Sequence, residues 1–221
     1  MNTVFDMSGG TIQNNYQYSR GAPISGDYGA GISAGDATVS ISDTASIVGN
    51  QAYNTVGSTS SISSHGGGLY AKGNTTITMT GGTFDANRAP ARSGGGGAVS
   101  LQENAKFIMT GGTMKNNQVG EYGIGGAIAA YKYSSVDISG GALFESNYGR
   151  NGGAVYANDD ASLRIAGATF KSNTGNYAGA VGNGSTVTLD LKAATFDSNN
   201  AEYGGEIPGQ NSKDIAPSPA S

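Results

Sequence analysis

Short stretches in which apolar and polar residues alternate recur along the whole chain. In residues 76–80, 106–110 and 135–139, every second side chain is apolar. Alternation over four to eight residues is typical of a β-strand with one buried face. No stretch shows the 3.6-residue spacing of an amphipathic helix. The pattern therefore predicts an all-β protein built from short strands.

A second pattern, an apolar residue followed by two variable residues and an asparagine, occurs seven times. Residues 84–87 (FDAN) and 144–147 (FESN) are two copies. The asparagines that end the copies are Asn15, Asn50, Asn87, Asn117, Asn147, Asn173 and Asn199. The steps between them are 35, 37, 30, 30, 26 and 26 residues. Repeats with periods of about 20 to 50 residues build solenoids.

A third pattern, two glycines followed by a small and an aliphatic residue, alternates with the second, as in residues 96–99 and 152–155. Each repeat therefore holds three short strands, with an apolar side that one repeat cannot bury alone. Stacked coils bury it, because each coil hydrogen-bonds to the next at about 4.8 Å. We predict a right-handed parallel β-helix, a solenoid with three short strands per coil and about seven coils.

The β-helix domain is expected to cover residues 1–207. The chain starts partway into a coil, without the glycine-rich strand of that coil, and we interpret it as part of a larger precursor. Residues 208–221 are polar and contain Pro208, Pro217 and Pro219. We expect them to form a tail, a linker or a loose cap.

The alternation also predicts which side chains face the interior, as four columns that run from coil to coil. The first two columns are Ile77, Phe107, Val136, Leu163, Val187 and Met79, Met109, Ile138, Ile165, Leu189. The column from the asparagine pattern is Ile12, Ile47, Phe84, Met114, Phe144, Phe170 and Phe196. The column from the glycine pattern is Leu69, Val99, Ile128, Val155, Val181 and Ile207.

Asparagine at a strand end tolerates a left-handed backbone, and stacked asparagine side chains can bond to one another. We therefore interpret the seven asparagines as a structural ladder rather than as ligand-binding amides. The position after the apolar residue of the same pattern alternates in charge. Opposite charges on adjacent coils favour one register. This column is Asp85, Lys115, Glu145, Lys171 and Asp197.

Composition excludes several functions. Charged residues are 13% of the chain and the net charge is -4, which disfavours nucleic acid and anionic membranes as partners. There is no cysteine, and no apolar run reaches the roughly 18 residues of a membrane span. The nonapeptide calcium-binding pattern is absent as well. We expect no metal, no cofactor and no membrane insertion by this segment.

Long inserts follow the asparagine of the early coils, at residues 16–28 and 51–65, and later inserts are shorter. Insertions on one side of a solenoid often mark its binding face, and tyrosine is favoured in binding loops. Plain packing of tyrosines over a sheet corner is the competing interpretation. The candidate ligand-binding loop tyrosines are Tyr16, Tyr18, Tyr28, Tyr53, Tyr122 and Tyr148.

The alternating GGA(I/L/V) and FxxN patterns resemble the repeats of the chlamydial polymorphic outer-membrane proteins. The pairs at residues 125–128 with 144–147 and 152–155 with 170–173 match them fully. Residues 109–113 (MTGGT) resemble the glycine-rich repeats of large bacterial surface proteins, also of the pectin-lyase-like group. The resemblance covers residues 4–207. It implies a secreted or cell-surface passenger of the adhesin type, attached through regions outside this chain.

We therefore expect a non-catalytic adhesin-like module that binds a host or neighbouring-cell glycoprotein or glycan. The alternative is a polysaccharide lyase or glycoside hydrolase, whose chemistry needs paired carboxylates or a metal with a basic residue. The only acidic doublet, Asp159-Asp160, and the only histidine, His65, fall at loop positions, and we interpret His65 as solvated. Thr76, Thr78 and Thr80 could start an ice-binding threonine array, but the outward column continues as Ile108, Asp137 and Arg164.

Overall fold

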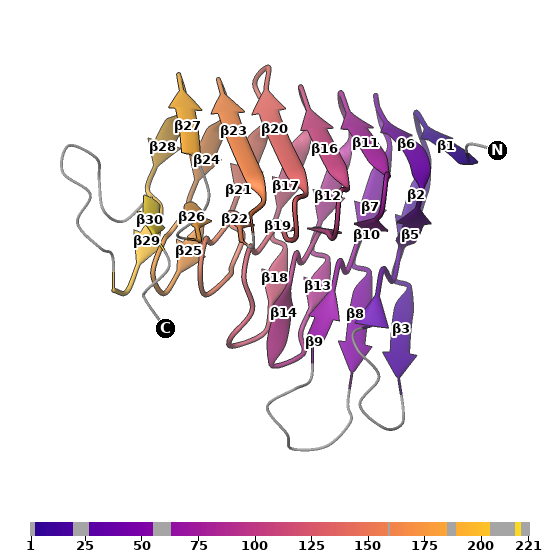
Figure 1. Ribbon diagram of the computed structural model, residues 1–221, viewed down its shortest axis with the longest axis horizontal. Helices are drawn as coiled ribbons and strands as arrows, with labels where there is room; N and C mark the ends of the chain where they lie inside the picture. Colours follow the sequence, from indigo (N-terminus) through magenta and orange to yellow (C-terminus); the bar gives the residue numbers. More distant parts are fainter. Residues whose placement is uncertain are drawn as a thin grey trace.

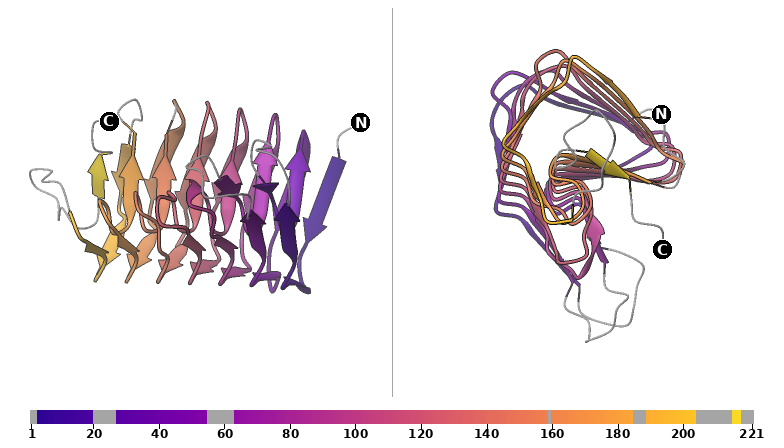
Figure 2. Two further views of the ribbon diagram at one scale, coloured as in Figure 1. Left: turned by 90° about the horizontal axis from the view of Figure 1, so that it is seen from below. Right: turned by 90° about the vertical axis from the view of Figure 1, so that its left-hand side faces the viewer.

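The computed structural model describes residues 3–19, 27–54, 63–158, 160–184, 189–203 and 215–217. The described residues form strands and turns and contain no helix. Three parallel sheets of seven strands run the length of the molecule as a right-handed β-helix (Figure 1). This confirms the predicted fold class, and seven strands per sheet agree with about seven coils. The end-on view in Figure 2 shows the coils superposed along one axis.

Each long sheet takes one strand from every coil. Sheet 1 contains β1 (Thr3–Met7), β6 (Ala37–Ile41), β11 (Thr76–Met79), β16 (Lys106–Met109), β20 (Ser135–Ser139), β23 (Ser162–Ala166) and β27 (Leu189–Lys192). Sheet 2 contains β2 (Thr11–Gln13), β7 (Ser46–Val48), β12 (Thr83–Asp85), β17 (Thr113–Lys115), β21 (Leu143–Glu145), β24 (Thr169–Lys171) and β28 (Thr195–Asp197). Sheet 3 contains β5 (Ile32–Gly35), β10 (Leu69–Lys72), β15 (Val99–Leu101), β19 (Ile128–Ala130), β22 (Val155–Ala157), β26 (Val181–Asn183) and β30 (Ile215–Pro217).

The sequence analysis interpreted the inserts between the asparagine and glycine patterns as loops, but the structure shows that they are not plain loops. They carry additional strands that pair between coils and extend below the long sheets in Figure 1. One insert sheet contains β3 (Tyr16–Ser19), β8 (Gln51–Asn54), β13 (Arg88–Ala89) and β18 (Gln118–Val119). Another contains β4 (Asp27–Tyr28), β9 (Ser63–His65) and β14 (Ser93–Gly95), and a short pair joins β25 (Thr174–Gly175) to β29 (Asn200–Ala201).

The main core contains the predicted interior columns, which are almost completely buried from the second coil to the sixth, together with residues that were not predicted, such as Leu101 and several alanines. Near one end, the rings of Phe144, Phe170 and Phe196 stack with centroid distances of 4.9 and 5.3 Å. The last strand of sheet 1, β27, pairs in a different register from the one predicted. Leu163 pairs with Leu189 rather than with Val187, so that Leu191 takes the place opposite Ile165.

In sheet 3, Ile215 of β30 pairs with Val181, the position predicted for Ile207. Val187 and Ile207 both lie outside the described residues. Residues 215–217 belong to the segment expected to be a tail, so that part of this segment pairs with the solenoid.

The paired glycines before sheet 3 have two different roles. The first glycine of each pair has a positive φ, for example +68° at Gly96 and +60° at Gly125, where other residues are strained. The second glycine is needed for close approach. A Cβ on Gly126 would lie 2.1 Å from the carbonyl oxygen of Gly153. The chain therefore bends at the first glycine and passes close to the next coil at the second.

The middle strands of sheet 3, β15, β19 and β22, are buried on both faces, which the sequence analysis did not predict. Its inner face contributes residues such as Val99 to the main core, whereas its outer face contains the buried residues Tyr70, Ala129 and Tyr156. The insert strands cover this outer face. A Cβ on Gly95 of β14 would lie 2.7 Å from the Cβ of Ala129, so only glycine permits this contact. The protein thus has a main core and an insert side that packs against it.

Candidate functional site

The seven repeat asparagines form a continuous ladder at the end of sheet 2. From Asn15 to Asn173, each side-chain amide donates to the Oδ1 of the asparagine in the next coil, over 2.8 to 3.1 Å. That same Oδ1 also accepts the main-chain N–H of the preceding asparagine, as in the 3.0 Å bond from Asn87 N to Asn117 Oδ1. The other hydrogen of the same amide group is donated to a main-chain carbonyl of the previous coil. For Asn117 this carbonyl is that of Phe84.

The five asparagines from Asn50 to Asn173 are at most 1% exposed. Buried amides with all their bonds made cannot reach a ligand, so the ladder is structural. The left-handed backbone lies one residue earlier than we expected. It falls on the residue before each ladder asparagine, with φ of +54° at Ala86 and +56° at Ser146. The ladder position therefore requires asparagine for the hydrogen bonds of its side-chain amide and not for a left-handed backbone.

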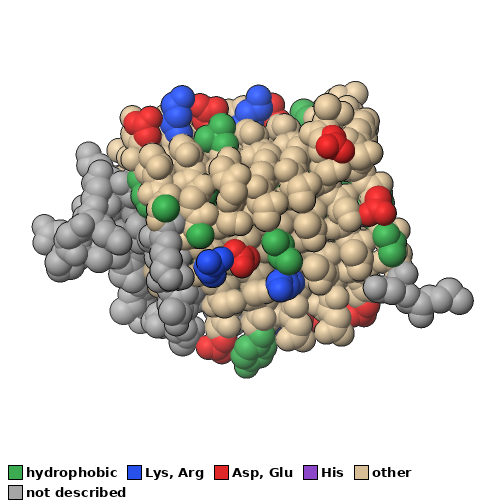
Figure 3. Space-filling view, turned by 90° about the horizontal axis from the view of Figure 1, so that it is seen from above, with side chains coloured by type: hydrophobic (Ala, Val, Ile, Leu, Met, Phe, Trp, Pro, Cys, Tyr) green, Lys and Arg blue, Asp and Glu red, His purple; other side chains and the backbone are tan. Residues whose placement is uncertain are grey.

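Ion pairs between neighbouring coils form on the outer faces of sheets 1 and 2. The predicted column on sheet 2 is in register, and two of its pairs are Lys115–Asp85 at 3.5 Å and Lys171–Glu145 at 3.1 Å. On sheet 1, Arg164 pairs with Asp137 at 3.1 Å. Figure 3 shows this side of the molecule, where Lys and Arg lie next to Asp and Glu on a mostly uncharged surface.

The outward column that begins at Thr78 continues as Ile108, Asp137 and Arg164. Its residue types therefore do not form the regular threonine array that ice binding needs.

The insert side carries most of the predicted tyrosines. Tyr16 and Tyr18 of β3 are 68% and 50% exposed, and the ring of Tyr18 stacks on that of Tyr53 at 6.0 Å. The register of the insert strands places Tyr16 and Tyr148 in one column, with three polar residues between them, and the column continues past Tyr148 to Thr174. Up to Tyr148 the column is Tyr16, Gln51, Arg88, Gln118 and Tyr148. Tyr28 lies in β4, and its side chain is outside the described part of the protein.

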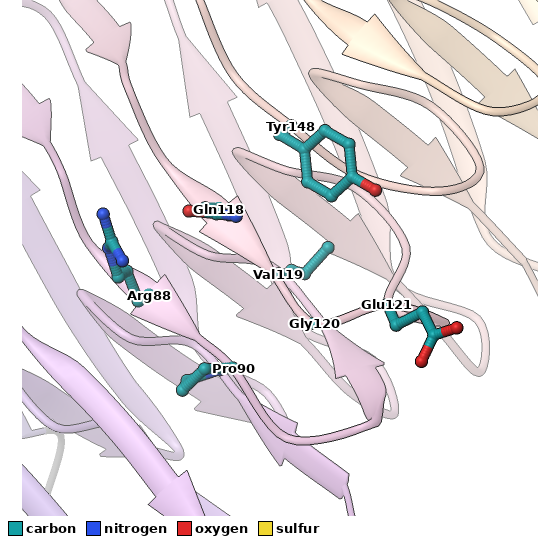
Figure 4. A pocket seen from close by; sticks show the side chains of 7 residues that line it. All are labelled: Arg88, Pro90, Gln118, Val119, Gly120, Glu121 and Tyr148. Atoms are coloured by element: carbon teal, nitrogen blue, oxygen red, sulfur yellow. The ribbon is translucent and has the colours of Figure 1, made fainter. Parts of the chain in front are cut away.

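A pocket of about 360 Å³ opens on the same insert sheet (Figure 4). Its lining residues are Arg88, Pro90, Gln118, Val119, Gly120, Glu121 and Tyr148. Figure 4 shows Arg88 on one side and Tyr148 and Glu121 on the other, with Gln118 and Val119 between them. An aromatic ring beside amide, guanidinium and carboxylate groups suits a polar ligand with one flat apolar face, such as a sugar.

Next to the pocket, arginine and tyrosine side chains from successive coils alternate in a stack. The guanidinium carbons of Arg92 and Arg150 each lie 4.8 Å from the centre of the Tyr122 ring. Arg150 also lies 5.4 Å from the ring centre of Tyr177 and donates to its hydroxyl at 3.3 Å. Tyr203 continues the stack, 5.7 Å from Tyr177. We call Arg92, Tyr122, Arg150 and Tyr177 the arginine–tyrosine stack.

His65 is not the solvated loop residue that the sequence suggested. It lies in β9, its Nδ1 is buried, and its ring meets that of Tyr131 edge-on at 5.6 Å. Burial disfavours the charged imidazolium and lowers the pKa of His65 to about 4. Of the acidic doublet, Asp160 is exposed in a turn and Asp159 lies outside the described residues.

Sequence reasoning found the tyrosines but not the residues that surround them. It did not single out Arg88, Arg92, Gln118 or Arg150 as site residues. A signal was present, since Arg92, Tyr122, Arg150 and Tyr177 all follow a ladder asparagine by three to five residues. The structure brings Tyr16 and Tyr148 into one column and Tyr18 next to Tyr53, whereas Tyr122 belongs to the separate stack.

Comparisons with family models, curated proteins and solved structures find no match to this chain. Among the described residues, no three or more histidine, aspartate or glutamate side chains gather in a way that could hold a metal ion. The part of the chain that the structure describes also has no apolar helix of the length needed to cross a bilayer.

Proposed function

We propose that the protein is a non-catalytic, adhesin-like module that binds a glycan or glycoprotein of a host or neighbouring cell through its insert side. In this proposal the chain is part of a larger secreted or surface-attached protein, as its resemblance to surface repeat proteins implies. The stack of coils serves as a rigid scaffold. The insert side presents the binding residues in fixed register.

The observation that carries the proposal is the exposure of two tyrosines of one insert strand, whereas the apolar residues of the interior columns are almost completely buried. Tyr16 and Tyr18 project from a sheet that is held in register on one long edge, beside a pocket with an aromatic ring, an amide and a guanidinium. Holding a tyrosine exposed on an ordered strand lowers the entropy lost on binding. Exposed aromatic surface of this kind is typical of recognition sites.

The test compares the chain with a Tyr16→Ser/Tyr18→Ser/Tyr53→Ser variant on a glycan array and on intact cells. We expect the variant to lose binding, because the exposed aromatic surface is removed. Tyr133→Ser is the matched control. Tyr133 is 69% exposed, but it lies in the turn between β19 and β20 and not in an insert strand. Equal binding by the triple variant and the unchanged protein would contradict the proposal.

The same glycans also test the enzymatic alternative. Incubation of the protein with pectin, alginate and glycosaminoglycans should leave them intact if the module only binds. Release of unsaturated or reducing ends would instead support a polysaccharide lyase or glycoside hydrolase.

A further inference from the structure

The arginines of the insert side differ in their partners from three cations of sheets 1 and 2. Lys115, Lys171 and Arg164 each lie within 3.5 Å of a carboxylate oxygen. Within the described ranges, neither Arg92 nor Arg150 forms an ion pair with a carboxylate. They contact tyrosine rings instead. Their charge is therefore not neutralised inside the protein, although the chain as a whole has a net charge of -4.

Stacking on tyrosine fixes how these guanidinium groups can be used. Both neighbours of Tyr122 in the stack are guanidinium groups, so neither face of this ring is left for a sugar or a nucleobase. A guanidinium that packs its face on a ring keeps its N–H donors in the plane of the group, at its edge. Such an edge matches the two oxygens of a carboxylate or a sulfate, which it binds with paired hydrogen bonds.

The two arginines are also set at a regular spacing along the molecule. Arg92 belongs to the insert after Asn87 and Arg150 to the insert after Asn147, two coils further on. Tyr122 of the intervening coil lies between them, and main-chain bonds hold the three inserts together, such as Tyr122 N to Arg92 O at 2.9 Å. At about 4.8 Å per coil, the two charges are roughly 10 Å apart along the axis. An extended polymer with repeated negative groups can meet both.

We propose that the arginine–tyrosine stack binds an anionic polysaccharide, whose carboxylate or sulfate groups pair with Arg92 and Arg150 while the chain runs along the solenoid axis. This inference rests on the proposed function and specifies its ligand class. Arg88 in the adjoining pocket adds a third cation. Two carboxylates limit where a polyanion can lie along the stack. Glu121 lines the same pocket, and Glu202 accepts a hydrogen bond from Asn176 at 2.9 Å.

The test measures binding of the intact chain to two carboxylated polymers, alginate and polygalacturonate, to sulfated heparin, to neutral dextran and to a thymidine oligonucleotide. We expect binding to at least one anionic polysaccharide, weakened by salt, and none to dextran. Arg92→Gln/Arg150→Gln should lower that affinity about a hundredfold, or tenfold per arginine. Arg92→Lys/Arg150→Lys keeps the charge but removes the paired N–H donors of the guanidinium group, and should lower the affinity about tenfold.

The matched control is Lys115→Gln/Lys171→Gln, which removes the same charge from sheet 2 and should leave the affinity within about twofold. Melting curves of all variants report whether the fold is retained. The inference is overturned if Arg92→Gln/Arg150→Gln and Lys115→Gln/Lys171→Gln bind the anionic polysaccharide equally well. It is also overturned if the two arginines are needed for binding to the oligonucleotide and not for binding to the polysaccharide. Tyrosine-dependent binding to neutral glycans alone would overturn this inference and leave the proposed function standing. Failure to bind any glycan or cell would overturn both.

Discussion

The stack of coils and the insert side use the same residue types in opposite ways. In the stack, amides bond to amides, charges pair with charges and phenylalanine rings lie on one another in the core. On the insert side, tyrosines are exposed, and arginines lie on tyrosine rings without a carboxylate partner among the described residues. The amide ladder and the charge pairs of the coils bond within the molecule, whereas the stacked arginines of the insert side leave donors available. The difference separates what holds the molecule together from what can contact another molecule.

Removing one amide from the middle of the ladder should have the largest effect on stability. Asn117→Ala leaves Asn87 without the acceptor of two bonds and the buried carbonyl of Phe84 without its donor. Each buried group left unpaired costs about 1–3 kcal/mol, so we expect a loss of about 3–5 kcal/mol. Urea unfolding followed by circular dichroism measures it. Asn15→Ala, at the exposed end, should cost under about 1 kcal/mol; similar losses at both sites would contradict a cooperative ladder.

Acid should weaken the insert side through His65. Its pKa in the folded protein, about 4, is lower than the 6.5 of the unfolded chain. The folded state thus favours neutral His65, a contribution that is complete above pH 6.5 and is lost as the pH falls toward 4. The loss can reach about 3 kcal/mol. His65→Gln should remove this component, so the stability difference between the two proteins should change between pH 7 and pH 4. A constant difference would refute the assignment.

The left-handed residue before each ladder asparagine offers a gain in stability. Ser146 has a φ of +56°, which costs a residue with a Cβ roughly 1–2 kcal/mol. Ser146→Gly relieves this cost but gains freedom in the unfolded chain, so we expect a net stabilisation of about 0.5–1 kcal/mol. The midpoint of thermal unfolding should rise. Ser135→Gly, on β20 in regular extended backbone, is the control and should destabilise the protein instead.

The charge pairs on sheet 2 should contribute least. The side chains of Lys171 and Glu145 are 48% and 32% exposed, and solvent screens their attraction. A double-mutant cycle with Lys171→Ala and Glu145→Ala should give a coupling free energy of about 0.5 kcal/mol or less, reduced further by salt. A coupling above about 2 kcal/mol would mean that these pairs hold the stack together rather than favour its register.

Much of the stack of coils could be predicted from the sequence. In a strand every second side chain faces the interior, so the alternation of apolar and polar residues identifies the inward-facing side chains. The register of β27 could not. Residues 187, 189 and 191 are all apolar, so a shift by two residues keeps the same face inward. The structure selects the register in which Leu189 pairs with Leu163 and Leu191 with Ile165.

The insert side was less predictable for a different reason. Strands such as β13 and β18 have two residues each, too short for any alternation, and they pair because the coils beside them hold their ends in place. The members of the arginine–tyrosine stack also follow their ladder asparagines at varying distances of three to five residues. The side chains still meet, because each insert bends differently before it rejoins sheet 3. Neither feature leaves a fixed spacing in the sequence.

The asparagine ladder also gives the molecule an electrical direction. In each of the six ladder bonds the amide donates toward the next coil, so the accepting Oδ1 atoms point toward Asn15 and the donated hydrogens point toward Asn199. Dipoles aligned head to tail add, as the peptide dipoles of an α-helix do. Two such columns can continue one another only when they point the same way, because the reverse arrangement sets oxygen against oxygen. Any end-to-end contact that extends the ladder must therefore be head to tail.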